Sequence, residues 1–258
     1  MTQKIGLNMY SLRDLCGDES ALNDTFASVR KIGYRYVQIS GISSVEPDAI
    51  ANAMRANDLA ACATHLSWDR FTDETDAVIE LHRLYGTTHS AIGGLPQEYF
   101  STDGLTRFVE EATDVLPKLR AAGLDFSYHN HNHEFAHYEG APWIDGLYKL
   151  GAPLGINFEV DTYWVVAGGA DPVAYMNRFG ESMSIIHVKD MIVTPKREQR
   201  FSPVGSGNLN WAGIFEVVRS APIEFVIVEQ DTHYDDDPLR NVEASFSFLA
   251  KSGLGLIG

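Results

Sequence analysis

The feature that most constrains the fold is one pattern that repeats along the chain. Short apolar or β-branched runs recur, each followed by a longer stretch with helical periodicity, as in βα units around a parallel sheet. Eight such units, each of about 30 residues, close into a barrel of about 250 residues. The 258-residue chain is therefore predicted to form a single (β/α)8 barrel, one domain over residues 1–258. The predicted strands are 4–7, 34–39, 60–64, 87–92, 124–129, 155–159, 184–188 and 224–228.

Capping residues mark several helices between these strands. Glycine is common just after a helix, and aspartate followed by proline is common at a helix start. The glycine signal predicts helices at 24–32 and 105–122, which end before Gly33 and Gly123. The Asp-Pro signal predicts helices that start after Asp171 and after Asp237, and the second of these, 238–249, is the eighth helix.

The longest irregular stretch, residues 191–210, follows the predicted seventh strand. Loops after the strands of such a barrel lie over its mouth, so this stretch is a candidate lid or substrate loop. It contains Gly205, Ser206 and Gly207. Their backbone N–H groups could bind a phosphate, but so short a segment is a weak signal, and the alternative is a flexible turn.

Composition and motifs disfavour several classes of function. The net charge of −15 is unfavourable for binding nucleic acid. The chain has no run of about 20 apolar residues and no signal-like start, so we expect a cytoplasmic protein with no membrane partner. Cys16 and Cys62 are not spaced as a redox pair. GxGxxG, GxxxxGK[ST] and GxSxG motifs are absent from the sequence, and no organic cofactor is expected.

Polar side chains gather where the predicted strands end. In a parallel barrel these positions converge on one pocket. The polar residues at the strand ends are Asn8, Tyr10, Ser11, His65, the segment HNHNHE at 129–134, Glu159, Asp161, His187, Lys189, Asp190, Glu229, Gln230 and Asp231.

Four of these residues suit a divalent metal ion. Glu134, Asp161, His187 and Glu229 follow or end four successive predicted strands. Carboxylate oxygens with imidazole nitrogen suit Mn²⁺, Mg²⁺, Co²⁺ or Zn²⁺. A single such residue is more often a helix cap or a hydrogen-bonded loop residue, but the four together favour a metal site.

The segment HNHNHE carries three histidines at alternate positions. His129, His131 and His133 are predicted to share one face of an extended segment, because side chains alternate along a strand. The alternative is a solvated histidine-rich loop.

Seven segments, in order and spacing, resemble the xylose isomerase-like TIM-barrel superfamily of sugar phosphate isomerases and epimerases. The similarity covers essentially the whole chain, and it implies a Glu/Asp/His/Glu metal site with Asp161, His187 and Glu229 as ligands from the sixth, seventh and eighth strands. The segments are IGLNMYSLRD, GYRYVQISG, THLSW, YHNHNHEF, FEVDTYWVVAGG, IIHVKD and VIVEQD.

The resemblance leaves the fifth-strand ligand open. Ketose 3-epimerase-like members carry a glutamate on the strand where this sequence has His129, and the nearest carboxylate is Glu134. Either Glu134 reaches the metal, His129 replaces the acid, or both contribute. The HNHxxEF variant is similar to relatives that act on keto-sugars, inososes and keto-glycosides. Apurinic-site endonucleases share the superfamily, but Trp164 stands where their Asp-x-x-His pattern would require a histidine.

The expected activity is that of a metal-dependent sugar isomerase or epimerase. It would abstract a proton next to a carbonyl and pass through a metal-bound enediolate. Glu134 and Glu229 are the candidate bases for the two faces of the carbon, and His131 is the alternative to Glu134. The candidate substrate-binding residues are His65, His129, Lys189, Trp164 and Asn8, with Trp68 and Tyr163 as further aromatic candidates.

Structural alternatives exist for two of these candidates. His65 could be a buried, hydrogen-bonded histidine, and Lys189 could pair with Asp190 or Glu159.

Two other functions are compatible with the same residues. A keto-sugar or inosose dehydratase, or a keto-glycoside lyase, would form the same enolate and expel a group from the β-carbon. A sugar-binding subunit would need a partner chain to complete its site. The small-molecule partner is a sugar or keto-sugar in each case, and a homo-oligomer is compatible with the sequence.

Overall fold

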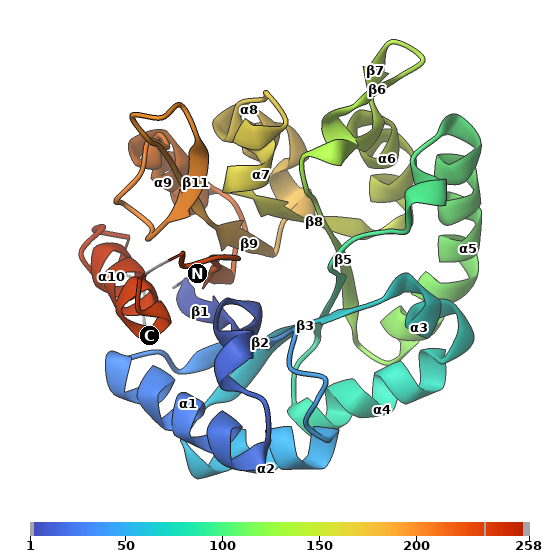
Figure 1. Cartoon of the computed structure of the whole chain (residues 1–258). Coiled ribbons are helices and arrows are strands. Elements are labelled where there is room, and N and C mark those ends of the chain that lie inside the picture. Colours follow the sequence, from blue (N-terminus) through green and yellow to red (C-terminus); the bar gives the residue numbers. More distant parts are fainter. Residues whose placement is uncertain (1–2, 235, 255–258) are drawn as a thin grey trace.

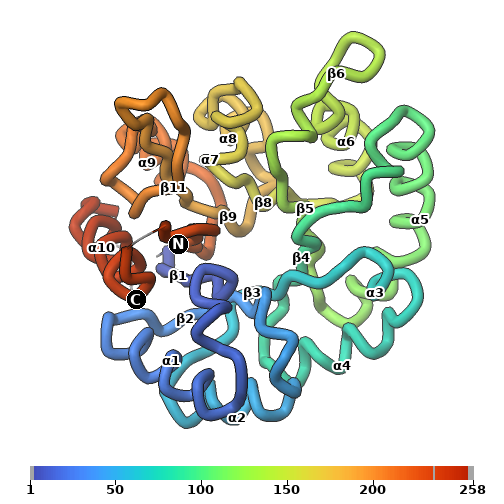
Figure 2. Tube along the Cα trace, viewed as in Figure 1, coloured from blue at the N-terminus to red at the C-terminus, as the bar shows by residue number. Residues whose placement is uncertain are grey.

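The computed structural model describes residues 3–234 and 236–254, and its central feature is a closed parallel barrel. The strand order is β1-β12-β9-β8-β5-β4-β3-β2, which confirms the predicted (β/α)8 fold (Figure 1). β1 pairs with β12, so the first strand lies beside the C-terminal part of the chain and closes the ring (Figure 2). The barrel strands are β1 (Lys4–Asn8), β2 (Tyr36–Ile39), β3 (Ala60–Leu66), β4 (His89–Ile92), β5 (Asp125–His129), β8 (Ile156–Asp161), β9 (Ile185–Val188) and β12 (Phe225–Val228).

Helices surround the barrel as an outer ring (Figure 1). The side chains of Asp18, Asp171 and Asp237 accept hydrogen bonds from backbone N–H groups in the first turns of α1, α8 and α10. Among the helices in the described ranges, none has both the length and the hydropathy needed to cross a membrane. The α-helices are α1 (Glu19–Ile32), α2 (Pro47–Ala56), α3 (Trp68–Asp73), α4 (Thr75–Tyr85), α5 (Thr102–Ala121), α6 (Trp143–Gly151), α7 (Thr162–Ala167), α8 (Pro172–Phe179), α9 (Trp211–Ser220) and α10 (Pro238–Ala250).

Several element boundaries differ from their predictions. α1 begins at Glu19 instead of residue 24, because its N-cap, Asp18, lies ahead of the apolar residues on which the prediction was based. β2 and β4 begin at Tyr36 and His89 instead of 34 and 87. β3 and β8 continue to Leu66 and Asp161, so Asp161 ends a strand and is held by the sheet.

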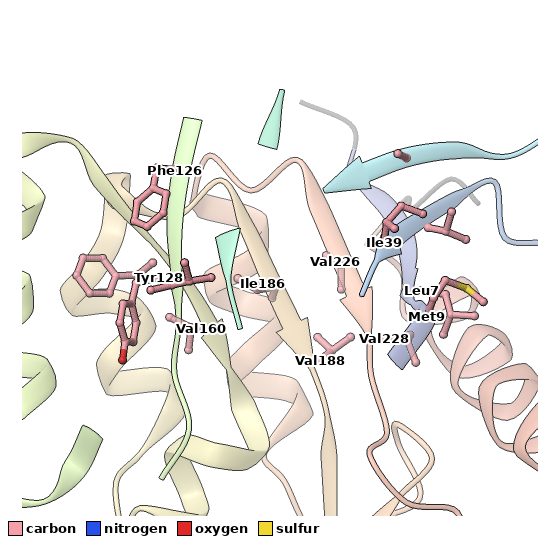
Figure 3. Packing of buried hydrophobic residues seen from close by; sticks show 14 of the residues in the cluster. Leu7, Met9, Ile39, Phe126, Tyr128, Val160, Ile186, Val188, Val226 and Val228 are labelled. Atoms are coloured by element: carbon pink, nitrogen blue, oxygen red, sulfur yellow. The ribbon is translucent and has the colours of Figure 1, made fainter. Parts of the chain in front are cut away.

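The main core lies between the barrel and its helices. Alternate residues of a strand face opposite sides of the sheet. Side chains such as Leu7, Phe126, Val160, Val188 and Val228 belong to this buried core (Figure 3). The residues between them therefore face the barrel interior.

Inside the barrel an apolar layer lies beneath a polar one. A separate buried cluster contains Cys62, Ala63, Ile185, Phe225 and Ile227. Two residues beyond Ile185 and Ile227, on the same inward face, stand His187 and Glu229. The apolar layer thus supports charged groups at the C-terminal mouth.

The segment after β9 is more regular than predicted. β10 (Asp190–Val193) and β11 (Gln199–Ser202) form an antiparallel hairpin, and a second small hairpin joins β6 (His137–Tyr138) to β7 (Ala141–Pro142). The prediction of an irregular stretch over 191–210 is therefore wrong for its first half. The polar turn sequence TPKRE at 194–198 interrupts the alternation that would have indicated two strands.

Candidate metal centre

Four side chains at the ends of adjacent strands converge at the mouth of the barrel. His129 ends β5, Asp161 ends β8, His187 lies on β9 and Glu229 follows β12. One donor atom of each lies within 4.8 Å of the others, and all four residues are buried. Asp161 Oδ2 is 3.4 Å from His129 Nε2, and Glu229 Oε2 is 3.0 Å from His187 Nδ1. The structure thus brings together Asp161, His187 and Glu229, as predicted, with His129 as the fourth member.

Each of the two carboxylates is oriented by a hydrogen bond to its other oxygen. Asp161 Oδ1 accepts from the backbone N–H of Trp164 at 3.0 Å and so caps α7. Glu229 Oε1 accepts from Asn8 Nδ2 at 2.8 Å. These bonds leave Asp161 Oδ2 and Glu229 Oε2 directed toward the two imidazoles.

His187 is fixed from the far side of its ring. Its Nε2 lies 2.7 Å from Glu159 Oε1 and 2.6 Å from Gln38 Oε1. Burial would lower the pKa of His187, but the carboxylates of Glu159 and Glu229 raise it to about 10. A carboxylate behind a metal-binding imidazole commonly orients the ring, and here it leaves Nδ1 facing Glu229.

Glu159 also holds His65. His65 Nε2 lies 2.7 Å from Glu159 Oε2. Burial would raise the pKa of Glu159, but His187 and His65 hold it well below its ordinary value. Glu159 is therefore an ionised carboxylate that links the two imidazoles.

His129 has the properties of a neutral nitrogen ligand. Burial lowers the pKa of its imidazole to about 4. Its Nδ1 is buried without a hydrogen-bond partner in residues 3–234 and 236–254. Two imidazole nitrogens and two carboxylate oxygens form a donor set that suits a borderline divalent cation, so the group could hold a metal ion.

Lys189 provides a positive charge next to this group. Its Nζ lies 2.9 Å from Asp161 Oδ2, 2.6 Å from Glu229 Oε2 and 2.8 Å from Asp231 Oδ1. Burial would lower the pKa of Lys189, but the three carboxylates raise it well above its ordinary value. Burial raises the pKa of Asp231 to about 6. The partners considered from the sequence, Asp190 and Glu159, form no ion pair with Lys189 among the described residues.

Glu134, predicted as a ligand and as a base, lies outside the group of four. Its buried carboxylate accepts hydrogen bonds from the Tyr128 hydroxyl at 3.0 Å and from the backbone N–H of His131 at 2.8 Å. Burial raises the pKa of Glu134 to about 7. Both oxygens thus hold the loop after β5, and His129 stands with the other three donors in its place.

The three alternating histidines do not share one face, because the strand ends at His129. The ring centroids of His129 and His131 are 4.9 Å apart, but His133 belongs to a short 3-10 helix and its side chain is 46% exposed. Burial and the neighbouring His129 and Lys189 lower the pKa of His131 to about 2, so His131 is neutral. Two further close groups lie beside the four donors: one is His65, Glu159 and His187. The other is His131, His133 and Glu134, in which the Glu134 oxygens are already hydrogen-bonded.

A cavity of about 380 Å³ opens beside the four donors. Of the predicted site residues, it is lined by His65, His129, His131, Lys189 and Glu229. The other lining residues are Tyr10, Ser40, Gly41, Leu66, Ser67, Gly93, Gly94 and Asp231. This volume is within the range of small-molecule sites.

The predicted aromatic contacts are mostly structural. Trp68 is buried, donates its indole N–H to Glu111 at 2.7 Å and packs in the core, and Tyr163 packs on Phe201. Trp164 lies behind the cavity wall, with its ring centroid 5.3 Å from that of His131 and 5.3 Å from Lys189 Nζ.

Comparison with known proteins adds the family. A family model described as xylose isomerase-like TIM barrel matches residues 26–252. The chain belongs to this family. No curated protein matches it closely enough to add a more specific assignment.

Several solved structures share its fold. A sugar phosphate isomerase/epimerase from Parabacteroides distasonis superposes with a TM-score of 0.81 at 22% identity, covering 98% of this chain and 99% of that one. An L-ribulose 3-epimerase gives 0.74 at 17% identity, covering 98% and 94%. The probable 3-DHS dehydratase AsbF from Bacillus anthracis gives 0.70 at 13% identity, covering 96% and 99%.

In this xylose isomerase-like barrel the glycine-rich turn at 205–207 binds the protein's own carboxylate. The backbone N–H groups of Gly205 and Gly207 each donate to Asp190 Oδ2 at 2.9 Å, as does the Trp211 indole at 2.8 Å. The turn therefore anchors the segment after β11, and these N–H groups are not free for a phosphate.

Sequence reasoning missed the roles of three residues that shape the site. Gln38 stands inside the otherwise apolar strand YVQI, and this lone polar residue is the signal that could have identified it. Glu159 was recognised as a strand-end residue but not as the partner of His187 and His65. Asp231 was recognised as a strand-end residue but not as the third partner of Lys189.

Proposed function

We propose that the protein is a divalent-metal-dependent sugar isomerase or epimerase that removes a proton from a carbon next to a carbonyl group. The observation that carries the proposal is the convergence of His129, Asp161, His187 and Glu229 beside a cavity in a xylose isomerase-like barrel. The sugar phosphate isomerase/epimerase and L-ribulose 3-epimerase among the structural neighbours support chemistry on sugars.

The four convergent residues would hold Mn²⁺, Mg²⁺, Co²⁺ or Zn²⁺. When bound, such a cation supplies Lewis-acid polarisation of a substrate oxygen. Trp164, Asn8 and Glu159 keep Asp161, Glu229 and His187 oriented through the hydrogen bonds described above. Such supporting bonds normally matter almost as much as the ligands themselves.

We assign proton transfer to Glu229 and His131, which both line the cavity. Burial would raise the pKa of Glu229, but Lys189 and His187 hold it well below its ordinary value. Since burial also lowers the pKa of His131, both residues are unprotonated at ordinary pH, which is the form that a general base needs. Glu134 becomes a positioning residue, because its carboxylate holds the backbone of His131.

His65 is the residue we assign to a substrate hydroxyl. It lines the cavity, and its bond from Nε2 to Glu159 leaves Nδ1 available. Asn8 and His129, earlier expected at the substrate, belong to the metal site, and Trp164 supports the wall behind His131.

The test is proton exchange at carbon. The Mn²⁺-loaded protein is incubated in D₂O with a panel of free and phosphorylated ketoses, and recovered sugars are analysed by NMR. We expect deuterium at the epimerised carbon with wild type and its loss in Glu229→Gln. Absence of exchange with every sugar of the panel, in protein that binds Mn²⁺, would refute the proposal.

A second candidate is a dehydratase or lyase acting through the same enolate. The fold shared with the probable 3-DHS dehydratase and the HNHxxEF segment favour it. Keto-inositols and keto-glycosides then give an α,β-unsaturated product, detected by ultraviolet absorbance. Its formation, without deuterated epimer, would select this candidate over the first.

A further inference from the structure

The ammonium of Lys189 contacts the same two oxygens that the metal site would use. Asp161 Oδ2 faces His129 Nε2 at 3.4 Å, and Glu229 Oε2 faces His187 Nδ1 at 3.0 Å. Lys189 Nζ lies 2.9 Å from the first oxygen and 2.6 Å from the second. The other oxygen of each carboxylate already accepts a hydrogen bond, from Trp164 and Asn8.

Lys189 therefore meets a divalent cation as a like charge at short range. Two positive charges a few ångströms apart in a buried site repel strongly. Both need Asp161 Oδ2 and Glu229 Oε2, so the ammonium weakens cation binding unless another anion draws it away.

Asp231 is that anion. Its Oδ1 lies 2.8 Å from Lys189 Nζ, its side chain is 19% exposed, and it lines the cavity on the loop after β12. Its carboxylate is outside the group of four donors.

We propose that Lys189 sets the metal affinity of the site: the ammonium competes with the divalent cation for Asp161 and Glu229, and Asp231 retains Lys189 when the cation is bound. The inference rests on the metal site in the proposed function, and it does not depend on which sugar is turned over.

The experiment is Mn²⁺ titration of the metal-stripped full-length protein by isothermal calorimetry. We expect Lys189→Met to bind Mn²⁺ about tenfold more tightly than wild type or better, because a competing charge is removed. Lys149→Met, on the exposed face of α6, changes the net charge equally and is the matched control. Lys189→Arg keeps the charge and should not tighten binding.

Asp231→Asn supplies the second arm. In wild type it should weaken Mn²⁺ binding about tenfold, because the ammonium then rests on Asp161 and Glu229 alone. In the Lys189→Met background it should change the affinity little. An equal loss in both backgrounds would mean that Asp231 attracts the cation directly, and would overturn the proposal.

The outcomes separate this inference from the metal site itself. Binding that is unchanged or weaker in folded Lys189→Met overturns the role of Lys189 while the site stands. Failure of wild type and all variants to bind Mn²⁺ removes the site. If Lys189→Met does not fold, the test uses Asp231→Asn in the wild-type and Lys189→Arg backgrounds. Unchanged Mn²⁺ affinity in both backgrounds would contradict the proposal.

Discussion

Glu159 Oε1 lies 2.7 Å from His187 Nε2, on the edge of the imidazole opposite the contact between Nδ1 and Glu229. The buried pair fixes the ring and increases the basicity of the nitrogen that faces the metal site. Glu159 would thus influence a metal ion bound at this site without touching it.

Replacing Glu159 with glutamine should weaken Mn²⁺ binding. The neutral amide keeps the shape but removes the charge behind His187, and loss of such a partner typically costs about 10- to 100-fold in metal affinity. Calorimetric titration measures the change, with Glu216→Gln on the exposed face of α9 as the control of equal charge. Equal affinities in the two variants would mean that Gln38 alone orients the ring.

Stability should fall as the pH rises through the window in which Glu134 ionises. Burial raises the pKa of Glu134 to about 7 from its ordinary value of 4.5, so the folded protein binds more protons than the unfolded chain between these values. Protonated Glu134 makes its full contribution to the free energy of unfolding below pH about 4.5. This contribution is lost as the pH rises to about 7, and the total loss is up to about 3 kcal/mol.

The difference between wild type and Glu134→Gln isolates this effect. Urea denaturation of both proteins at pH 5, 6 and 7.5 gives the free energy of unfolding, and wild type should lose stability relative to the variant as the pH rises. Parallel pH profiles for the two proteins would show that Glu134 has the same pKa in the folded and unfolded states.

Replacing Asp190 with asparagine should loosen the segment after β11. One carboxylate oxygen accepts from the backbone of Gly205 and Gly207 and from the indole of Trp211, and an amide nitrogen at that position accepts none of them. Leaving buried donors unpaired costs about 1–3 kcal/mol each, so a loss of at least about 2 kcal/mol is expected.

Urea denaturation and hydrogen exchange at 203–211 report this loss. Asp171→Asn is the matched control, because asparagine caps a helix nearly as well as aspartate does and should change stability by only a few tenths of a kcal/mol, roughly. A shift no larger than that of the control would contradict the anchoring role of Asp190.

The fold could be predicted because every βα unit repeats the same alternation of apolar run and capped helix. Asp161, His187 and Glu229 could be predicted because a parallel barrel brings its strand ends together. The sequence could not decide between His129 and Glu134 as the fourth member of this group, because the choice depends on where β5 ends. The strand stops at His129, and the 3-10 turn that follows uses Glu134 to hold the loop.

Residues that act on the site only through another residue were harder to predict from the sequence. Gln38 and Glu159 reach His187 across the barrel interior, from β2 and β8. Their sequence positions, far from each other and from His187, carry no spacing signal. Only closure of the barrel makes them neighbours.

The most direct test of the central claim is the metal content of the protein after loading with Mn²⁺ and removal of free metal, measured by elemental analysis. We expect about one ion per chain in wild type and Glu134→Ala, and loss of the ion in His129→Ala, Asp161→Ala and His187→Ala, since these three belong to the group of four and Glu134 does not. Equal metal content in all five proteins would contradict the site, and loss in Glu134→Ala with retention in His129→Ala would assign the fifth-strand ligand to the glutamate.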